Sequence, residues 1–577
     1  MTRWRPAGDA ALLLQAEGLA ARLAAAILPV RPEGVLDVVP GAGTVLVITQ
    51  PGSLDLAELA ERLLALPLTP ASRANAALTE IPVVYDGPDL DEVARLTGLP
   101  PGEVVARHLA AEYTVGWLGF SPGFGYLTGL DPVLASVPRM AEPRLRVPAG
   151  AVAIAGGFAG VYSSTSPGGW RLLGRTSAAL WDTDRDPPAM LTPGMRVRFR
   201  QVDALPDVAS PPSAPPAPST PDRSSDVHDR GASHAYIAPH APRSWTGGSA
   251  IEVIKPGPLA TVQDLGRPGY GHLGVPHSGA ADAASLRLAN RLVGNADGAA
   301  GIELTFGRAA FRFPAGAWVA VTGASAPVTL ETGQAGDAPV TAGGAPGRGS
   351  GTARDMPRDA EFSIPAGGVV RVGAPAAGLR SYLAVRGGIG VPPVLGSRST
   401  DLRSGLGPAA LRPGDALPVG VAAEPGPAAG AGGHAAETTA LPVADAAAMV
   451  APTVMPVAGE PAVLRVVPGP RDDWFEPDAL RQLCAGTYVV TPASDRTGLR
   501  LDGPALVSAR SDQLPSEGVA TGALQVPPSG RPILLLADHP VTGGYPVIAT
   551  VLSADIGLAA QLRPGSKVRF ALATQGR

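Results

Sequence analysis

The chain has 577 residues, enough for several domains of roughly 100–200 residues each. Its net charge of −4 and its charged share of 17% argue against a nucleic-acid partner, which would call for a basic surface. No apolar run approaches the roughly 18 residues of a membrane span, so we expect no membrane segment. The single cysteine, Cys484, excludes internal disulfides and argues against cysteine-based zinc sites. We therefore expect a cytoplasmic protein.

Lysine is almost absent, and this limits how the chain can bind phosphate. Only Lys255 and Lys567 occur, against 46 lysines and arginines in all. Neither lies in the Gly-Lys-Ser/Thr sequence of a P-loop, and neither lies in a Met-Lys-Met-like biotin hairpin. Any bound phosphate must then be held by arginine, by backbone N–H groups or by a metal ion.

The first part of the chain, residues 1–203, predicts a small α/β lobe followed by a β lobe. Ser53 is the expected cap of a helix whose apolar positions repeat at helical spacing. Pro101 suits the first turn of a second helix. After Tyr113 the pattern changes to short β-type runs broken by Gly and Pro. The expected strands are 45–48, 81–85, 152–155, 161–162, 171–173 and 197–199.

Two segments predict flexible connections. Residues 204–248 are rich in Pro, Ser, Asp and His, with almost no large apolar side chains, and predict a disordered linker. Residues 421–459, rich in Ala, Gly and Pro, predict a flexible insertion, and a shorter one is expected at about 334–354. The chain therefore reads as a fusion of 1–203 with 249–573.

The second part, residues 249–573, is mostly strands with one clear helix. Asp282 is the expected cap of that helix and Gly294 its stop. Two β-barrel-like lobes are expected, with the insertion at 421–459 between them. The predicted fold class is therefore mainly β with α/β additions. The expected strands are 318–322, 362–364, 369–372, 381–385, 463–467, 488–491, 533–537 and 567–571.

Two segments of the first part are candidates for binding. The aromatic and glycine-rich run 119–127 is either a core plug or the wall of a pocket. In the run 166–176, successive Ser and Gly N–H groups next to two arginines could form an anion nest; the alternative is a hairpin turn beside surface arginines. The candidate cofactor-binding residues here are Ser166, Gly168, Gly169, Arg171 and Arg175.

The densest set of polar groups is the decapeptide Thr261–Tyr270, in the second part. Gln263, Asp264 and Arg267 offer an amide, a carboxylate and a guanidinium within five positions. The alternative is an Asp–Arg pair that braces a turn. The loop 274–279 leads into the predicted helix, whose N-terminus could hold an anion, although Asp282 already offers a cap.

Two later segments complete the candidate site. Residues 494–500, with Arg496, follow a predicted strand. We treat residues 515–518, with Glu517, and residues 537–546 as one candidate cluster. In the second of these segments, Asp538 and His539 directly follow an apolar strand. His539 is the best acid–base candidate by its ordinary pKa, although a lone histidine is more often structural. We expect Asp264, Arg496 and His539 to meet in one cleft.

These residues carry a resemblance. The B component of bacterial 5-oxoprolinase, a kinase-inhibitor-like protein, resembles this chain at segments 81–83, 119–127, 143–144, 147–150 and 166–176. The C component of the same enzyme resembles it at segments 261–267, 278–280, 289–290, 294–295, 382–388, 394–401, 494–496, 516–518, 525–527 and 538–546. Both parts also look like the carboxyltransferase region of urea carboxylase. One departure stands at 156–160, where Phe158 replaces the amide that the family pattern has.

The resemblance implies cyclophilin-like β-barrel lobes in both halves and a B–C unit that works with a separate A component. The implied reaction is ATP-dependent opening of the 5-oxoproline lactam to glutamate, with ATP and Mg²⁺ as cofactors; a homo-oligomer is also allowed. We hypothesise that Arg267 and Arg496 neutralise anionic charge, and that Asp264 and Glu517 hold Mg²⁺. The remaining candidates are His539 and Tyr545 for catalysis and Thr542, Gly543 and Gly544 for cofactor binding.

Two other functions stay open at this point. One is a carboxyltransferase that acts on urea or a related amide, with its biotin carrier on another protein. The other is a regulator that binds a histidine kinase, which needs a partner surface rather than a polar pocket. Kinship of fold alone does not choose among the three functions.

Overall fold

The structure is a computed structural model that describes residues 3–68, 78–140, 142–205, 250–332, 352–421, 453, 455–457, 459–510 and 512–573. Most of the linker predicted at 204–248 and of the insertions predicted at 334–354 and 421–459 lies outside these residues. The chain divides into two compact units. The first comprises residues 1–71, 117–123 and 240–577, and the second comprises 72–116 and 124–239. Within the described residues, no helix is long and apolar enough to cross a bilayer.

The first unit begins with a four-stranded antiparallel sheet in the order β1-β2-β4-β3. Side chains alternate across the sheet, so Leu12 and Leu14 pack against the two helices of this lobe. Leu13 faces the other way and packs with Ala520 and Val541 of the C-terminal part. The elements are β1 (Trp4–Pro6), β2 (Ala11–Gln15), α1 (Ala20–Ile27), η1 (Leu28–Val30), β3 (Val35–Pro40), β4 (Thr44–Thr49) and α2 (Leu56–Leu64).

The sheet is apolar on the face of Leu13 as well as on the face that carries the helices. This explains why the two compact units differ from the halves 1–203 and 249–573 that the linker predicted. If residues 3–68 stayed with 78–205 alone, Leu13 and its neighbours would face water, which is unfavourable for apolar surface. The sheet instead joins the C-terminal part of the chain. The small α/β lobe expected at the N-terminus is present, but it belongs to the first unit.

One helix cap differs from expectation. Helix α2 begins after Asp55, whose carboxylate accepts hydrogen bonds from the N–H groups of Ala57 and Glu58 at 2.8 and 3.0 Å. Ser53, the expected cap, lies two residues too early and donates to the Gln50 carbonyl. Pro101 does occupy the first turn of its helix, and Asp282 does cap its own helix through the Ser285 N–H.

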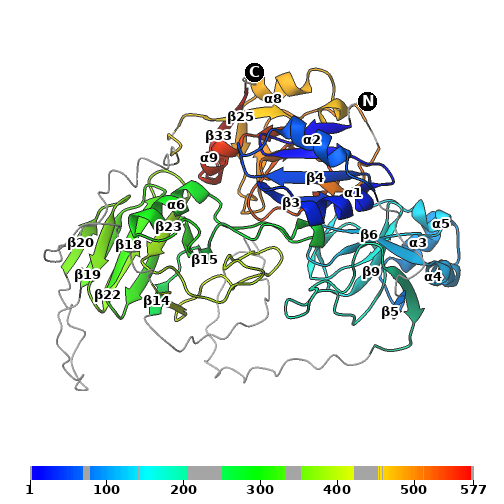
Figure 1. The fold of residues 1–577 in the computed structure, drawn as a ribbon, viewed down its shortest axis with the longest axis horizontal. Coiled ribbons are helices and arrows are strands. Elements are labelled where there is room, and N and C mark those ends of the chain that lie inside the picture. Colours follow the sequence, from blue (N-terminus) through cyan, green and yellow to red (C-terminus); the bar gives the residue numbers. More distant parts are fainter. Residues whose placement is uncertain are drawn as a thin grey trace, which may run out of the picture. The chain divides into compact units, whose positions relative to one another are not determined.

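Residues 250–418 form two packed sheets, drawn in green to yellow in Figure 1. One core cluster draws side chains from both sheets, and α6 (Ala283–Leu292) packs on the outer face of the five-stranded sheet. The six-stranded sheet comprises β20 (Thr352–Met356), β19 (Val328–Thr332), β22 (Gly368–Val372), β17 (Ala309–Phe313), β14 (Ala250–Lys255) and β24 (Ala416–Pro418). The five-stranded sheet comprises β15 (Leu259–Gln263), β16 (Gly301–Thr305), β23 (Arg380–Val385), β18 (Ala317–Gly323) and β21 (Glu361–Ile364).

Residues 462–572 form a closed barrel with its own core. Of the two barrel-like lobes expected in the second half, this segment forms one as a closed barrel, whereas residues 250–418 form a pair of packed sheets instead. The barrel order is β25 (Ala462–Pro468), β32 (Val547–Val551), β29 (Ala523–Gln525), β30 (Ile533–Leu535), β27 (Gly498–Asp502), β26 (Tyr488–Val490) and β33 (Lys567–Leu572). Further elements are η3 (Gly271–Leu273), η4 (Asp472–Trp474), α8 (Ala479–Ala485), β28 (Glu517–Gly518), β31 (Thr542–Gly543), η5 (Ser553–Asp555) and α9 (Ile556–Ala560).

The second unit, taken by itself, is built on a seven-stranded sheet. Phe124, Tyr126, Tyr162 and Trp170 pack edge to face in its interior, so this part of the run 119–127 is a core plug. The sheet order is β12 (Arg171–Arg175), β9 (Ala151–Ala155), β10 (Phe158–Val161), β7 (Gly125–Thr128), β6 (Tyr113–Leu118), β13 (Arg196–Gln201) and β5 (Leu78–Val83). The remaining elements are α3 (Leu90–Thr97), α4 (Pro101–Ala110), α5 (Pro132–Ala135), β8 (Arg144–Val147) and β11 (Ser166–Gly168).

The mainly β fold with barrel-like lobes in both halves is thus confirmed. Phe158, where the family pattern has an amide, packs edge to face on Tyr126 with ring centroids 6.0 Å apart. That side chain joins the aromatic packing of the second unit.

Candidate functional site

Asp264 braces the turn that follows β15. Its Oδ1 accepts hydrogen bonds from the Gly266 N–H at 2.8 Å, from the Ser397 hydroxyl at 2.7 Å and from the Ser399 hydroxyl at 2.5 Å. Its Oδ2 accepts from the Arg398 N–H at 2.6 Å. Four donors therefore occupy this carboxylate, and it acts here as a brace rather than as an open metal ligand.

Arg267 is buried beside this brace, with only 1% of its surface exposed. Its Nη2 donates to the Ser399 carbonyl, but its Nε and Nη1 have no hydrogen-bond partner in the protein. Burial lowers the pKa of Arg267, and the carboxylates of Asp401, Asp264 and Asp538 act in the opposite direction. The guanidinium is therefore a buried cation among three carboxylates, with two donors unused.

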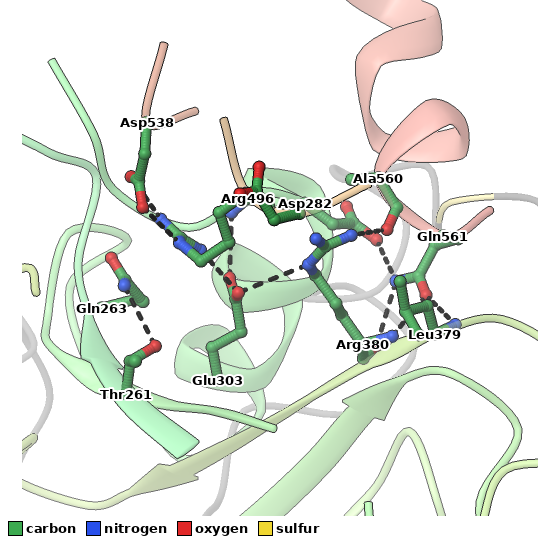
Figure 2. Close-up of polar contacts among 12 residues, drawn as sticks. Thr261, Gln263, Asp282, Glu303, Leu379, Arg380, Arg496, Asp538, Ala560 and Gln561 are labelled. Atoms are coloured by element: carbon green, nitrogen blue, oxygen red, sulfur yellow. Dashed lines mark hydrogen bonds and ion pairs between the residues drawn. The ribbon is translucent and has the colours of Figure 1, made fainter. Parts of the chain in front are cut away.

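Arg496 connects the barrel to the five-stranded sheet through buried ion pairs (Figure 2). Its Nε lies 2.8 Å from Asp538 Oδ2, its Nη1 lies 2.5 Å from Glu303 Oε1, and its Nη2 donates to the Gly279 carbonyl at 2.6 Å. Only 3% of its side chain is exposed, against 1% for each carboxylate. Burial alone would lower the pKa of Arg496, but the two carboxylates hold it well above its ordinary value.

The same chain of contacts continues toward α9. Arg380 Nε lies 3.5 Å from Glu303, and Arg380 Nη1 donates to the Ala560 carbonyl. Gln561 accepts from the Arg380 N–H at 2.8 Å and donates to the Asp282 carboxylate at 2.8 Å. Figure 2 shows these side chains lying between strands of the sheet and α9. The network therefore joins the packed sheets to the barrel segment.

Asp538 is where the predicted site residues meet. It binds Arg496 and also accepts a hydrogen bond from the Ser278 hydroxyl at 2.7 Å. Its charge acts on Arg267, on Asp401 and on His539. We call the set Arg267, Asp401, Arg496, Asp538 and His539 the Asp538 cluster; Asp264 adjoins it through Ser399. Asp264, Arg496 and His539 are thus linked through Asp538, Arg267 and Ser399, within the first unit.

The pKa values of Asp401 and His539 both depart from the ordinary values of an aspartate and a histidine. Burial raises the pKa of Asp401 to about 6, and the nearby Asp538 carboxylate adds to the rise. Burial lowers the pKa of His539 to about 4. Its Nδ1 lies 2.8 Å from the Pro540 carbonyl and its Nε2 lies 3.1 Å from the Thr521 hydroxyl. His539 is thus neutral at pH 7 with both nitrogens engaged, so Asp401 is the better proton carrier of the two.

Two elements from the first part of the sequence hold the loops of this site. The Asp37 carboxylate, at the start of the chain, accepts from the N–H groups of Gly269 and Gly271 at 3.0 and 2.7 Å. Burial raises its pKa, against the effect of those two hydrogen bonds. The loop that follows β6 contributes the Phe120 N–H, which donates to the Thr542 hydroxyl at 2.8 Å.

The loop around Phe120 also carries backbone strain. Phe120 has a φ of 65°, and Ser278 has a φ of 55°, in the left-handed region that bulky residues rarely adopt. The guanidinium of Arg403 lies over the Phe120 ring, 5.3 Å from its centroid. Strained non-glycine residues of this kind cluster at functional sites, and Ser278 adjoins the Asp538 cluster through its hydrogen bond to Asp538.

The other predicted site residues of the C-terminal part make their contacts away from the Asp538 cluster. They are Glu517, Tyr545 and the segment 542–544. Glu517 forms an ion pair with Arg471 at 2.6 Å, and burial raises its pKa. Tyr545 is 36% exposed. Thr542 uses its hydroxyl on Phe120, and Gly543 pairs with Glu517 between β31 and β28. Gly544 follows β31 and precedes Tyr545. The contacts found for these residues lie outside the Asp538 cluster.

The cofactor-binding candidates at 166–175 lie in the second unit. Arg175 is paired with Asp86 at 2.8 Å, and Arg171 lies 4.0 Å from Glu92. The Ser166 hydroxyl and Arg171 Nε are buried without a partner. Gly168 ends β11, and the Gly169 carbonyl accepts from the Met140 N–H. Two polar groups are thus still available here for an anion.

The expected Mg²⁺ site does not fit these contacts. Asp264 is saturated by four donors and Glu517 by Arg471. No group of three or more His, Cys, Asp or Glu residues suited to a metal ion occurs among the described residues. For ATP, the available groups are Ser166 and Arg171, which suit a phosphate oxygen.

Several residues of the network were not singled out from the sequence. Glu303 lies in the apolar run Gly301–Thr305, and a lone carboxylate in such a strand is a signal that it has a buried partner. Asp37 likewise interrupts the apolar strand β3, and Arg380 begins the apolar strand β23. Gln561 and Thr400 carry no comparable signal, because their roles depend on which loops meet in space.

Two regions of the chain match a known protein family. Residues 2–191 match the carboxyltransferase domain, subdomain C and D, and residues 273–572 match the carboxyltransferase domain, subdomain A and B. The C component of 5-oxoprolinase from Escherichia coli (strain K12) is 33% identical over 323 residues, 56% of this chain and 90% of that protein. The B component of 5-oxoprolinase from Escherichia coli O157:H7 is 47% identical over 174 residues, 29% of this chain and 77% of that protein.

A solved structure matches nearly the whole chain. The crystal structure of TTHA0988 superposes with a TM-score of 0.74 at 35% identity, covering 98% of this chain and 100% of that one. The order of the two carboxyltransferase regions in one polypeptide is therefore shared with a protein of known structure.

Proposed function

Since this chain belongs to the carboxyltransferase-domain family, with regions similar to the B and C components of 5-oxoprolinase joined in one polypeptide, we propose that it is the B–C component of an ATP-dependent 5-oxoprolinase. In this function the lactam of 5-oxoproline is opened to glutamate together with a separate A component. A cytoplasmic location, expected from the single cysteine, is part of the proposal.

One observation carries this proposal beyond the family. Asp37 and the loop at Phe120, from the B-like region, hold loops of the C-like region that border the Asp538 cluster. Two regions that correspond to separate proteins elsewhere therefore build one site here. A chain of this kind is expected to act as one component.

The chemistry of the substrate suits a charged, buried site. A five-membered lactam is a poor electrophile at neutral pH, and phosphorylation of its carbonyl oxygen by ATP would turn that oxygen into a leaving group. The chain's own residues would bind and orient the substrate: Arg267 offers unused donors for an anionic group, and Arg496 pairs with Asp538 beside it. Asp401, with a pKa near 6, would hold or release a proton.

The test uses the full chain with and without the A component. ADP release and glutamate formation are measured with 5-oxoproline, with urea and with no substrate. We expect ADP release that depends on 5-oxoproline and on both components. Release that responds to urea and not to 5-oxoproline would favour the carboxyltransferase alternative, and release that ignores 5-oxoproline contradicts the proposal.

A variant pair probes the shared construction of the site. Thr542→Val removes the acceptor of the Phe120 N–H and is expected to lower turnover by roughly tenfold, the effect of about 1.4 kcal/mol. Thr97→Val removes a hydroxyl that bonds to the Val93 carbonyl on α3 and is the matched control. Equal activities of the two variants would show that the Phe120 contact does not matter for turnover.

A further inference from the structure

Three buried side chains at one place in the first unit have polar atoms without a partner. These atoms are Nε and Nη1 of Arg267, Oε1 of Gln263 and Oγ1 of Thr400. All three side chains are almost fully buried. Buried polar groups in folded proteins nearly always have a hydrogen-bond partner. Three side chains with unused polar atoms at one place therefore indicate a ligand.

Two of these side chains bond to the backbone carbonyls of two consecutive residues, and the third side chain belongs to the second of those residues. Arg267 Nη2 donates to the carbonyl of Ser399, and Gln263 Nε2 donates to the carbonyl of Thr400 at 2.9 Å. The Ser278 hydroxyl, bonded to Asp538, also lies 3.4 Å from the Thr400 carbonyl. The unused atoms therefore adjoin the Asp538 cluster.

The orientation of the Gln263 amide is determined by its contacts. Its nitrogen lies 2.9 Å from the Thr400 carbonyl, which can only accept a hydrogen bond, and it also donates to the Thr261 hydroxyl at 3.1 Å. Figure 2 shows the amide nitrogen turned toward Thr261. The unused atom is therefore the carbonyl oxygen, an acceptor, so the missing partner at Gln263 must be a donor.

We propose that Arg267, Gln263 and Thr400 form the subsite for the carboxylate and the adjacent lactam N–H of 5-oxoproline. Arg267 Nε and Nη1 donate to the carboxylate, and Gln263 Oε1 accepts from the lactam N–H. In 5-oxoproline the carboxylate and the lactam nitrogen are bonded to the same carbon, so one small ligand carries both groups. The inference rests on the proposed function and names which end of the substrate the C-like region binds.

The charges around Arg267 allow it to take up a carboxylate. Asp264 accepts four hydrogen bonds, and Asp538 is paired with Arg496. A phosphate group would satisfy Arg267 as well, but it has no N–H, and in its fully ionised form it has no donor at all for Gln263 Oε1. The donor requirement at Gln263 therefore favours a carboxylate attached to an amide over a phosphate.

Binding to the full chain tests the subsite without turnover. Calorimetry at pH 7 compares 5-oxoproline with 2-pyrrolidone, which lacks the carboxylate, and with inorganic phosphate. We expect 5-oxoproline to bind at least about tenfold more tightly than either, as the loss of a charge-assisted hydrogen bond implies.

Two variants, each with a matched control, test the residues. Arg267→Lys keeps the charge but removes the planar fork and should weaken 5-oxoproline binding on the order of 10- to 100-fold without changing 2-pyrrolidone binding. Thr400→Val removes an unpartnered hydroxyl, so it should fold normally yet bind several-fold more weakly. The controls are Arg563→Lys, at an arginine that binds the carbonyls of Gly378 and Pro375, and Thr550→Val, at another unpartnered buried hydroxyl.

The outcomes separate the subsite from the proposed function. Equal binding of 5-oxoproline and 2-pyrrolidone, tighter binding of phosphate, or wild-type binding by Arg267→Lys would overturn the subsite. Selective 5-oxoproline binding with no substrate-dependent ADP release supports the subsite and counts against the ATP-dependent function. Substrate-dependent ADP release with no binding to this chain overturns the subsite and leaves the function in place.

Discussion

Replacing Arg496 with methionine should strongly destabilise the first unit, because it leaves two buried carboxylates without their main cation. Asp538 would keep only the Ser278 hydroxyl, at 2.7 Å. Glu303 would keep the Tyr382 hydroxyl at 2.9 Å, the Ala281 N–H at 3.0 Å and the more distant Arg380 at 3.5 Å. Breaking a buried ion pair costs about 3–5 kcal/mol, and we expect Asp538 to account for most of it.

Urea denaturation followed by tryptophan fluorescence and circular dichroism measures this loss at pH 7.5. The matched control is Arg312→Met, which breaks a surface pair with Glu252 in which the side chains are 47% and 42% exposed; it should cost at most about 1 kcal/mol. A loss for Arg496→Met no larger than that of the control would refute the view that the network is buried and paired. Adding Asp538→Asn to Arg496→Met should restore part of the stability.

The dependence on pH gives a second measurement on the same variant. Burial would raise the pKa of Glu303, but Arg496 and Arg380 hold it below its ordinary value of 4.5. In the wild type, this pairing therefore contributes stability above pH 4.5 that is lost as the pH falls through the lower folded-state pKa. In Arg496→Met the carboxylates lack that cation, so their pKa values should rise and protonation should relieve the destabilisation. The deficit should shrink from pH 8 toward pH 5, and a constant deficit would contradict the argument.

Three further predictions concern the site. Because the pKa of Asp401 is raised to about 6, binding of anionic 5-oxoproline should weaken as the pH rises from 5 to 7, and Asp401→Asn should remove that dependence in calorimetry. Asp37→Ala leaves the N–H groups of Gly269 and Gly271 without an acceptor, at about 1–3 kcal/mol each, and should raise KM, whereas Asp37→Asn keeps an acceptor and should retain binding. His539→Gln should leave the kcat/KM profile unchanged between pH 5.5 and 8, because the pKa of His539 is about 4; the loss of a limb near pH 6.5 would assign that limb to His539.

Local sequence patterns predicted most of the elements, and tertiary packing decided the rest. The first-turn position of Pro101 and the cap at Asp282 follow from the chemistry of helix ends, which involves only near neighbours. Ser53 was the wrong cap because Asp55 stands at the position from which an oxygen reaches the first free N–H groups. The grouping of residues 3–68 with the C-terminal part depended on Leu13, whose packing partners Ala520 and Val541 lie near the other end of the chain.

The candidate site shows the same division. The sequence predicted several polar groups of the site because charged residues there directly follow apolar strands. These groups are those in Thr261–Tyr270, at Arg496 and at Asp538–His539. The roles of those groups were not visible, since a role depends on the partner. Asp264 became a brace once Ser397 and Ser399 were placed beside it, and His539 lost its ordinary pKa through burial.

The sequence by itself determined the mainly β fold, the two joined regions, their family and the loops that carry the charged residues, because these depend on local periodicity and on short motifs. Only the tertiary structure decided that Asp37 and Phe120 support the loops of the C-like region, and that Arg267, Gln263 and Thr400 keep unused hydrogen-bonding atoms. The physical reason is that burial and hydrogen-bond satisfaction are properties of atoms brought together from distant parts of the chain. No local pattern records which of those atoms is left without a partner.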